Sequence, residues 1–180
     1  MTPQTAHLGP GDVLHGREVY LRVPRPDELA FIRMLWSDPE TMAAVGGPIE
    51  FSETKAIDWF SRVVSPGNGM SCYCLIFNSE DTPVGEVSFH KWDPAKRSAH
   101  LNIKVLARHR QRGYAKDALD AFLACFFGRV AGLVMTDDVA LDNPAGQRLL
   151  GSAGFTSDDS VADVCWMVIT REMFVKHDVR

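Results

Sequence analysis

The sequence predicts a mixed α/β (α+β) fold, in which helices cover a central sheet. Apolar residues recur at helical spacing in some segments and alternate with polar residues in others, and the two patterns are interleaved along the chain. Turn-forming Gly, Pro, Asn and Asp residues separate these segments. The length of 180 residues suits one domain with its own core. We therefore expect a single domain over residues 11–175, with flexible ends at 1–10 and 176–180.

The first third of the chain predicts one strand followed by two helices. Residues 18–23 alternate polar and apolar side chains, as a half-buried strand does. Over 26–36, an early proline and an apolar stripe at helical spacing predict a helix. The stretch 38–49 is rich in turn residues. A second helix is predicted over 52–63, since a serine precedes it and a Pro-Gly-Asn-Gly sequence follows it.

Three predicted strands follow in close succession, over 70–77, 83–92 and 98–106. The turns that join them are short, at 78–82 and 93–97. Short connections are typical of an antiparallel meander, so we expect these strands to be neighbours in the sheet.

The last third predicts an alternation of helix and strand. Apolar residues at helical spacing indicate a helix from 113 to about 128, and an apolar run over 130–139 indicates a strand. Asn and Pro open a shorter helix over 143–154. A final strand is predicted over 163–170.

Composition excludes several classes of protein. Nineteen Lys and Arg residues against 23 Asp and Glu residues give a net charge of −4, which argues against a broadly basic surface for nucleic acid. No apolar run approaches the roughly 18 residues of a membrane span, and the first residues lack the pattern of a signal peptide. We therefore expect a cytoplasmic protein without nucleic-acid or membrane partners.

The four cysteines and six histidines do not form a recognisable metal site. Cys72 and Cys74 are two residues apart on a predicted strand, and no second Cys or His pair has the spacing of zinc ligands. We expect reduced, partly buried thiols and no metal.

The most informative segment joins a strand to a helix through a cationic loop. It leaves the strand at Val105, carries Arg108, Arg110 and Arg112, and enters the helix at Gly113. The first N–H groups of a helix have no intrahelical partner and form a ready anion site. Glycine would let a phosphate approach the backbone. The alternative is a surface loop with solvated arginines, and neither a P-loop nor a Rossmann glycine motif is present.

Two motifs resemble those of the GNAT N-acetyltransferases. The Arg-Gln-Arg-Gly-Tyr-Ala sequence at 110–115 resembles the Q/R-x-x-G-x-G/A signature, and the segment 143–155 resembles the Asn-led helix that ends in Gly-Phe. The separation of the motifs, one helix and one strand, is also that of the family. The resemblance covers residues 18–170 and is strongest to the branch that includes the ribosomal-protein N-terminal acetyltransferases.

The resemblance implies a fold, a cosubstrate and a set of binding residues. The GNAT fold has a mostly antiparallel twisted sheet of about six to seven strands flanked by about four helices. The cosubstrate would be acetyl-CoA, with its pantetheine arm along the strand that ends at Val105 and its pyrophosphate on the loop. Asn143 would contact the pantetheine arm, although an N-cap role for this residue is equally open. The implied cofactor-binding residues are Val105, Arg110, Gln111, Arg112, Gly113, Tyr114, Ala115 and Asn143.

Acetyl transfer to an amine also needs a general base, because an ammonium has no lone pair. Alternation on the strand 98–106 puts His100, Asn102 and Lys104 on one face. His100 stands where the related branch usually carries Glu, and imidazole titrates near neutral pH, so it is our first candidate. Glu86 is the second and His90 a distant third. The alternative for His100 is a hydrogen-bonded histidine on a half-buried strand.

The leaving group and the acceptor are less determined. The family often has a tyrosine four residues before Gly154 that protonates the leaving thiolate, and here that position is Leu150. Acidic residues could attract a cationic amine or be plain solvated surface, and tryptophans could line a pocket or belong to the core. The residues concerned are Glu50, Asp93, Asp137 and Asp138, and Trp36, Trp59 and Trp92.

These observations predict an N-acetyltransferase that moves an acetyl group from acetyl-CoA to a primary amine of a protein N-terminus or a small molecule. A CoA-binding sensor or scaffold without turnover is the main alternative, and a nucleotide-phosphate enzyme is a weaker one. The protein would be a monomer or a homodimer.

Overall fold

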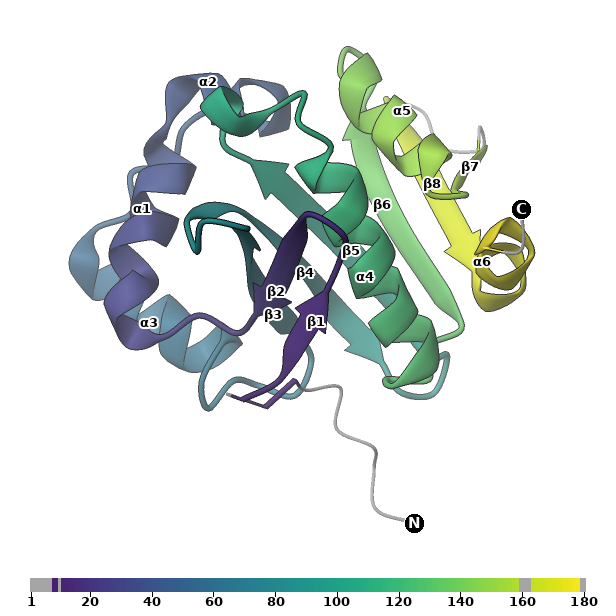
Figure 1. The fold of residues 1–180 in the computed structure, drawn as a ribbon, viewed down its shortest axis with the longest axis horizontal. Coiled ribbons are helices and arrows are strands. Elements are labelled where there is room, and N and C mark those ends of the chain that lie inside the picture. Colours follow the sequence, from purple (N-terminus) through teal and green to yellow (C-terminus); the bar gives the residue numbers. More distant parts are fainter. Residues whose placement is uncertain (1–7, 10, 159–162, 179–180) are drawn as a thin grey trace.

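A computed structural model describes residues 8–9, 11–158 and 163–178, and within them one eight-stranded sheet carries helices on both faces (Figure 1). The sheet order is β1-β2-β3-β4-β5-β6-β8-β7. All neighbouring strands are antiparallel except β5 and β6, which are parallel. The strands are β1 (Val13–His15), β2 (Val19–Arg22), β3 (Cys72–Asn78), β4 (Pro83–Asp93), β5 (Ser98–Val105), β6 (Val134–Ala140), β7 (Thr156–Asp158) and β8 (Val164–Thr170). The helices are α1 (Leu29–Ser37), α2 (Pro39–Met42), α3 (Glu53–Val63), α4 (Tyr114–Gly128), α5 (Pro144–Ser152) and α6 (Arg171–Asp178).

The mixed α/β fold class is confirmed, and so is the meander of β3, β4 and β5. The structure adds β1, β7, α2 and α6, which the sequence patterns did not predict. The strand predicted over 130–139 begins only at Val134, because Ala131 has a φ of 59° and turns the chain. Of the ends expected to be flexible, 1–7, 10 and 179–180 lie outside the described residues. Leu8 is buried, and 176–178 belong to α6.

Strand β3 separates two apolar cores. Every residue of β3 is buried, because helices cover both of its faces. Cys72, Cys74 and Ile76 pack into the larger core beneath α4. Tyr73 and Leu75, with Phe77, pack against α1 and α3 on the other face. Strand alternation therefore assigns one face of the sheet to α4 and the other to α1 and α3.

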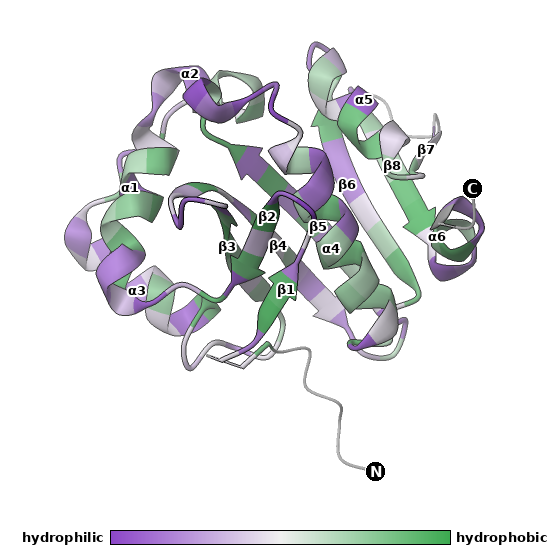
Figure 2. Cartoon of the chain, viewed as in Figure 1, coloured by the Kyte–Doolittle hydropathy of each residue, from purple (hydrophilic) through white to green (hydrophobic). Residues whose placement is uncertain are grey.

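The four cysteines are all free, as expected for reduced thiols. Among the described residues, no helix is long and apolar enough to cross a membrane. Figure 2 shows β3 and β8 mostly in the apolar colour, whereas a hydrophilic stretch interrupts β6. That stretch contains Asp137 and Asp138.

The parallel pair β5–β6 is short, and this opens the sheet. Pairing runs from Ser98↔Val134 to His100↔Thr136 and stops, although both strands continue. Antiparallel pairing of β5 with β4 persists as far as Val105. The two strands therefore part after His100, and the facing edges of their later residues border a gap in the sheet.

A carboxylate fastens the N-terminal hairpin to α4. Asp117, in the first turn of α4, accepts hydrogen bonds from the backbone N–H groups of Arg17, Glu18 and Val19 at 2.8, 2.7 and 3.0 Å. These contacts fix the turn between β1 and β2 against the helix that follows the cationic loop.

Candidate functional site

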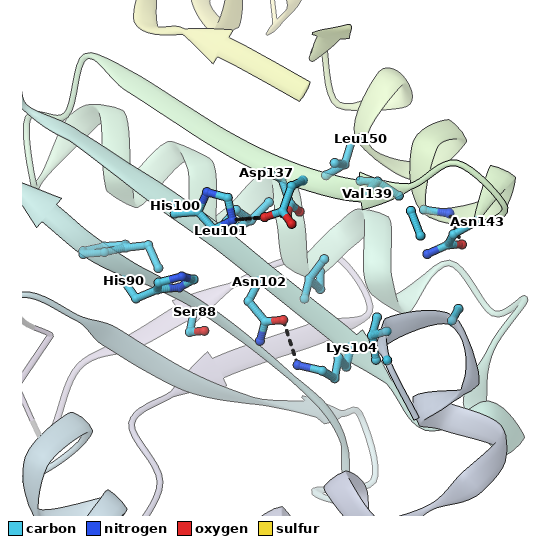
Figure 3. Close-up of a pocket in the computed structure, with 18 of the residues that line it drawn as sticks. Ser88, His90, His100, Leu101, Asn102, Lys104, Asp137, Val139, Asn143 and Leu150 are labelled. Carbon is cyan, nitrogen blue, oxygen red and sulfur yellow. Dashed lines mark hydrogen bonds and ion pairs between the residues drawn. The ribbon is translucent and has the colours of Figure 1, made fainter. Parts of the chain in front are cut away.

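A cavity of about 640 Å³ lies where β5 and β6 part (Figure 3). Its volume is in the range of small-molecule sites. Strand β4 contributes Ser88 and His90, and β5 contributes the polar row His100, Asn102 and Lys104. The remaining walls come from α1, the segment that follows α2, α3, β3, β6, α5 with its N-cap, and the start of β8. They include Trp36, Trp59, Tyr73, Asp137, Asp138, Asn143 and Leu150.

Glu86 is fully buried and lies at the centre of a hydrogen-bond network behind the cavity wall. Its Oε1 accepts from Lys104 Nζ at 2.9 Å and from Asn102 Nδ2 at 3.1 Å. Its Oε2 accepts from Trp36 Nε1 at 2.7 Å and from the Tyr73 hydroxyl. A carboxylate with four donors, one of them an ammonium, is a well-satisfied buried ion.

His100 carries a hydrogen-bonding partner on each ring nitrogen. Its Nε2 lies 2.6 Å from Asp138 Oδ1, and its Nδ1 lies 3.2 Å from Thr136 Oγ1. The imidazole is 12% exposed, whereas Asp138 is 50% exposed and reaches solvent. Burial lowers the pKa of His100, while Asp138 acts in the opposite direction, so the ring is neutral around pH 7.

His90 stands beside His100 with 4.9 Å between the ring centroids. Burial and the neighbouring His100 and Lys91 lower the pKa of His90 to about 4. A base with so low a pKa is weak, and this favours His100 over His90 as the base.

Asp137 is the opposite case, an acid that holds its proton. Its Oδ1 lies 3.9 Å from His100 Nε2, and its side chain is 16% exposed. Burial and the adjacent Asp138 raise the pKa of Asp137 to about 8, although the Asp138 backbone N–H and Lys104 act against the rise. Ligand atoms of His100, Asp137 and Asp138 all lie within 4.8 Å of one another, a spacing that one divalent cation could bridge, although acidic groups often cluster without one.

The cationic loop lies beyond the open end of β5 and enters α4 as expected. Gly113 is the N-cap of α4 with a φ of 81°, and a Cβ there would meet nothing within 4 Å. The approach to the first turn of the helix is therefore open. Gln111 and Arg112 are exposed on this loop, and Gln111 also has a positive φ of 60°.

Arg110 is exposed, but its guanidinium is hydrogen-bonded to the backbone. Its Nε donates to Val105 O at 3.3 Å, and its Nη2 donates to Thr41 O in α2 at 2.9 Å. The Thr41 hydroxyl in turn accepts from Ala107 N at 2.9 Å. Arg110 therefore braces the loop against α2.

On the other side of the gap, Asn143 caps α5. Its Oδ1 accepts from Gly146 N at 3.0 Å, which confirms the N-cap role, and the residue also lines the cavity. Leu150 lines the same cavity and is buried, at the position where the family often has tyrosine.

The structure places only part of the expected site on the cavity: Glu86 lies behind its wall, and Val105 and residues 110–115 are not among the lining residues. His100, Lys104 and Asn143 line the cavity, while the loop residues lie at the end of β5. Of the three tryptophans considered, Trp36 and Trp59 line the cavity, and Trp92 is buried in the larger core.

Sequence patterns suggested Asp137 and Asp138 only as attractors of a cationic amine and did not place them beside His100. The available signal was a pair of acids inside an otherwise apolar strand sequence, Val-Met-Thr-Asp-Asp-Val-Ala.

Comparison with known proteins adds a family and a set of similar folds. Residues 18–156 match the family model described as an acetyltransferase (GNAT) domain. The chain is similar to a spermidine N-acetyltransferase from Vibrio cholerae, solved in complex with CoA and spermine, with a TM-score of 0.80 and 19% identity over 88% of this chain and 98% of that one. It is also similar to a candidate ribosomal-protein-serine acetyltransferase from Vibrio cholerae, with a TM-score of 0.74 and 16% identity over 91% and 99% of the two chains. No curated protein matches the sequence.

Proposed function

The chain belongs to the GNAT acetyltransferase family and is an acyl-CoA-dependent N-acetyltransferase, and we propose that it acetylates the primary amine of a small cationic molecule from acetyl-CoA. The observation that carries the proposal is the His100–Asp138 pair, which faces the cavity where β5 and β6 part. Family membership agrees with the resemblance drawn from residues 110–115 and 143–155.

Acetyl-CoA would lie in the gap between β5 and β6 and supply the thioester that the amine attacks. From His100 to Val105 the strand β5 rises about 16 Å, and its edge toward β6 is free of strand pairing there. The free backbone groups of this edge could therefore hydrogen-bond the amide groups of the extended pantetheine arm. The N–H groups of Tyr114 and Ala115, in the first turn of α4, would hold the pyrophosphate next to the open Gly113. On the opposite wall, Asn143 would turn its Nδ2 toward the arm, since its Oδ1 holds α5.

His100 and Asp138 would take the proton of the amine. With Nδ1–H donated to Thr136 Oγ1, the Nε2 lone pair faces Asp138 and the cavity. The separation of 2.6 Å between Nε2 and Oδ1 is a hydrogen-bond distance, so it corresponds to the pair with one proton between the two atoms. The pair would reach this form when it takes the proton of the ammonium. The half-exposed Asp138 then passes that proton to solvent. The lowered pKa of His100 keeps the ring neutral and ready to accept.

Glu86, our second candidate for the base, is better suited to a structural role. Both of its oxygens are occupied by donors, and one of these is the Lys104 ammonium. Taking a further proton would break this buried ion pair, which is costly. We therefore propose that Glu86 fixes the cavity wall.

The walls of the cavity favour a cationic amine. Asp138 offers a carboxylate to an ammonium, and Trp36, Trp59 and Tyr73 offer aromatic surface. The volume of about 640 Å³ suits a small molecule, and spermine is bound by the similar spermidine N-acetyltransferase. A protein N-terminus is the second candidate, and the similar candidate ribosomal-protein acetyltransferase is the observation in its favour.

An amine panel tests the function directly. The purified protein would be given acetyl-CoA and polyamines, amino acids, aminoglycosides or peptides with a free N-terminus, with thiol release and product mass as readouts. We expect turnover with polycationic small amines and little with peptides, and an unchanged rate after chelation of divalent metals. CoA binding by calorimetry without turnover on any amine would instead indicate a sensor or scaffold, and competition by ATP would indicate a nucleotide site.

A pair of variants tests the base. His100→Gln should lower kcat about a hundredfold while CoA affinity stays within about twofold, because the phosphate-binding loop is at the far end of β5. The wild-type rate should rise with pH through a midpoint below the ordinary histidine value of 6.5, since burial lowers the pKa of His100 and only the neutral ring accepts a proton. His15→Gln, on the exposed strand β1, is the matched control. The base role fails if His100→Gln keeps the wild-type rate and pH profile.

A further inference from the structure

Asp137 occupies a position that the reaction described above does not use. Alternation along β6 places it with Met135 and Val139, which belong to the larger apolar core, and opposite to Thr136 and Asp138. Because β5 and β6 part at this level, its carboxyl still reaches to 3.9 Å from His100 Nε2. Figure 3 shows it at the cavity wall beside His100. Asp137 is therefore an acid on the apolar side of the gap, next to the base.

The charges around Asp137 explain why it stays protonated. Burial removes the water that would stabilise a carboxylate, and Asp138 adds a like charge on the same strand. Lys104 on β5 acts against this, but it is hydrogen-bonded to Glu86. The residues of α5 that line the cavity are Asn143, Gly146, Leu149 and Leu150, none of them titratable. The titratable groups lining the cavity around Asp137 are Asp138, His90, Lys91, His100, Lys104, Tyr73 and Asp163.

The sulfur leaves as a thiolate, which takes its proton either from water or from a donor in the site. Of the other protonated groups of the cavity wall, Tyr73 and Lys104 are already engaged, and Lys91 is exposed to solvent on β4. The Tyr73 hydroxyl donates to Glu86, and the Lys104 ammonium donates to Glu86 and to Asn102 Oδ1 at 2.7 Å. Leu150 has no proton to give. Asp137 is the carboxyl that lies in the gap itself.

We propose that Asp137 is the general acid of the reaction and protonates the departing thiolate. This inference rests on the proposed acetyl transfer. As the neutral amine bonds to the thioester carbon, the nitrogen gives one proton to the His100–Asp138 pair. Asp137 gives its proton to the sulfur, which keeps the electron pair of the broken C–S bond. His100 then returns its proton across 3.9 Å to the ionised Asp137, and both groups are restored.

Kinetics over a range of pH tests this role. Asp137→Asn keeps the size of the side chain but removes its acidic proton, and it should lower kcat about a hundredfold with little change in the KM for acetyl-CoA. The ratio of wild-type to variant rate cancels the titration of the amine. That ratio should fall in one step near pH 8, where Asp137 loses its proton. Asp142→Asn, an exposed residue after β6, is the matched control and should keep the wild-type rate.

A measurement without substrates tests the same residue independently. In protein labelled with ¹³C at aspartate carboxyl groups, one signal that is absent from Asp137→Asn should titrate near pH 8. A titration midpoint near the ordinary aspartate value of 3.8 overturns the proposal. The proposal is also overturned if the wild type is active but the ratio of its rate to that of Asp137→Asn does not change with pH. If the wild type acetylates no amine at all, the proposed function fails and the acid role fails with it. An active wild type with a failed ratio test leaves the proposed function standing.

Discussion

The substitution Glu86→Gln separates the structural role of this residue from a catalytic one. It preserves the shape of the side chain but replaces one oxygen by an NH2 group, which cannot accept a hydrogen bond. Two of the four donors around Glu86 therefore lose their acceptor, and Lys104, whose side chain is 11% exposed, loses its counter-ion.

The expected cost follows from the burial of the pair. Glu86 is fully buried, so its screening by solvent is weak. Removing one partner of a buried ion pair costs about 3–5 kcal/mol, because the other charge is left uncompensated. For a chain of 180 residues, this corresponds to a fall in Tm of about 6–20 °C.

The assay combines urea unfolding with kinetics on the same samples. Glu86→Gln should lose about 3–5 kcal/mol in the free energy of unfolding. The double variant Glu86→Gln/Lys104→Met should regain about 1–3 kcal/mol, since the unpaired ammonium is gone. Well below its melting temperature, Glu86→Gln should keep kcat within about tenfold of the wild type. A variant that is as stable as the wild type but has lost its turnover would refute this reasoning and make Glu86 the base.

Three further predictions concern the cationic loop, the hairpin of β1 and β2, and the sheet. Gly113→Asp should weaken CoA binding at least about tenfold in calorimetry, and more than Arg110→Ala does, because in the proposed site fixed helix N–H groups, and not the braced arginine, would hold the phosphates. The reverse order would contradict this. Asp117→Ala removes three hydrogen bonds to the backbone and should lower the free energy of unfolding in urea by about 2–3 kcal/mol. Asp120→Ala, on the exposed side of the same helix, should lower it by less than about 1 kcal/mol. Equal losses would contradict the contact between Asp117 and the hairpin. Gly85→Ala should lower Tm by several degrees, since its Cβ would lie 2.2 Å from Lys104 O and force β4 and β5 apart, and an unchanged Tm would show that the strands adjust freely.

Local sequence patterns were sufficient for the longer elements and insufficient for the short ones. Strands β3, β4 and β5 and helix α4 each carry a long apolar pattern, and their boundaries were predicted within a few residues. The strands β1 and β7 have three residues each and α2 has four, too few to show a period. Helix α6 follows β8 without a break, so no turn residue marks its start.

The same distinction applies to the site. The face of β5 that carries His100 followed from alternation alone. The proximity of Asp137 did not, because alternation along β6 places it opposite to Thr136, the strand partner of His100. Only the early end of the β5–β6 pairing brings the two groups together, and that feature depends on how whole strands twist and pack.

The hydrogen bond between Arg110 and Thr41 links the binding of the two proposed substrates. Thr41 holds the cationic loop through its carbonyl and its hydroxyl, and the chain that follows α2 forms the wall of the cavity at Ala44 and Gly46. The surface that would receive the cosubstrate phosphates and the surface that would receive the amine are thus parts of one tied segment. Kinetic constants for the two substrates will therefore not vary independently, and a change in α2 made to widen the choice of amine will also alter the hold on acetyl-CoA.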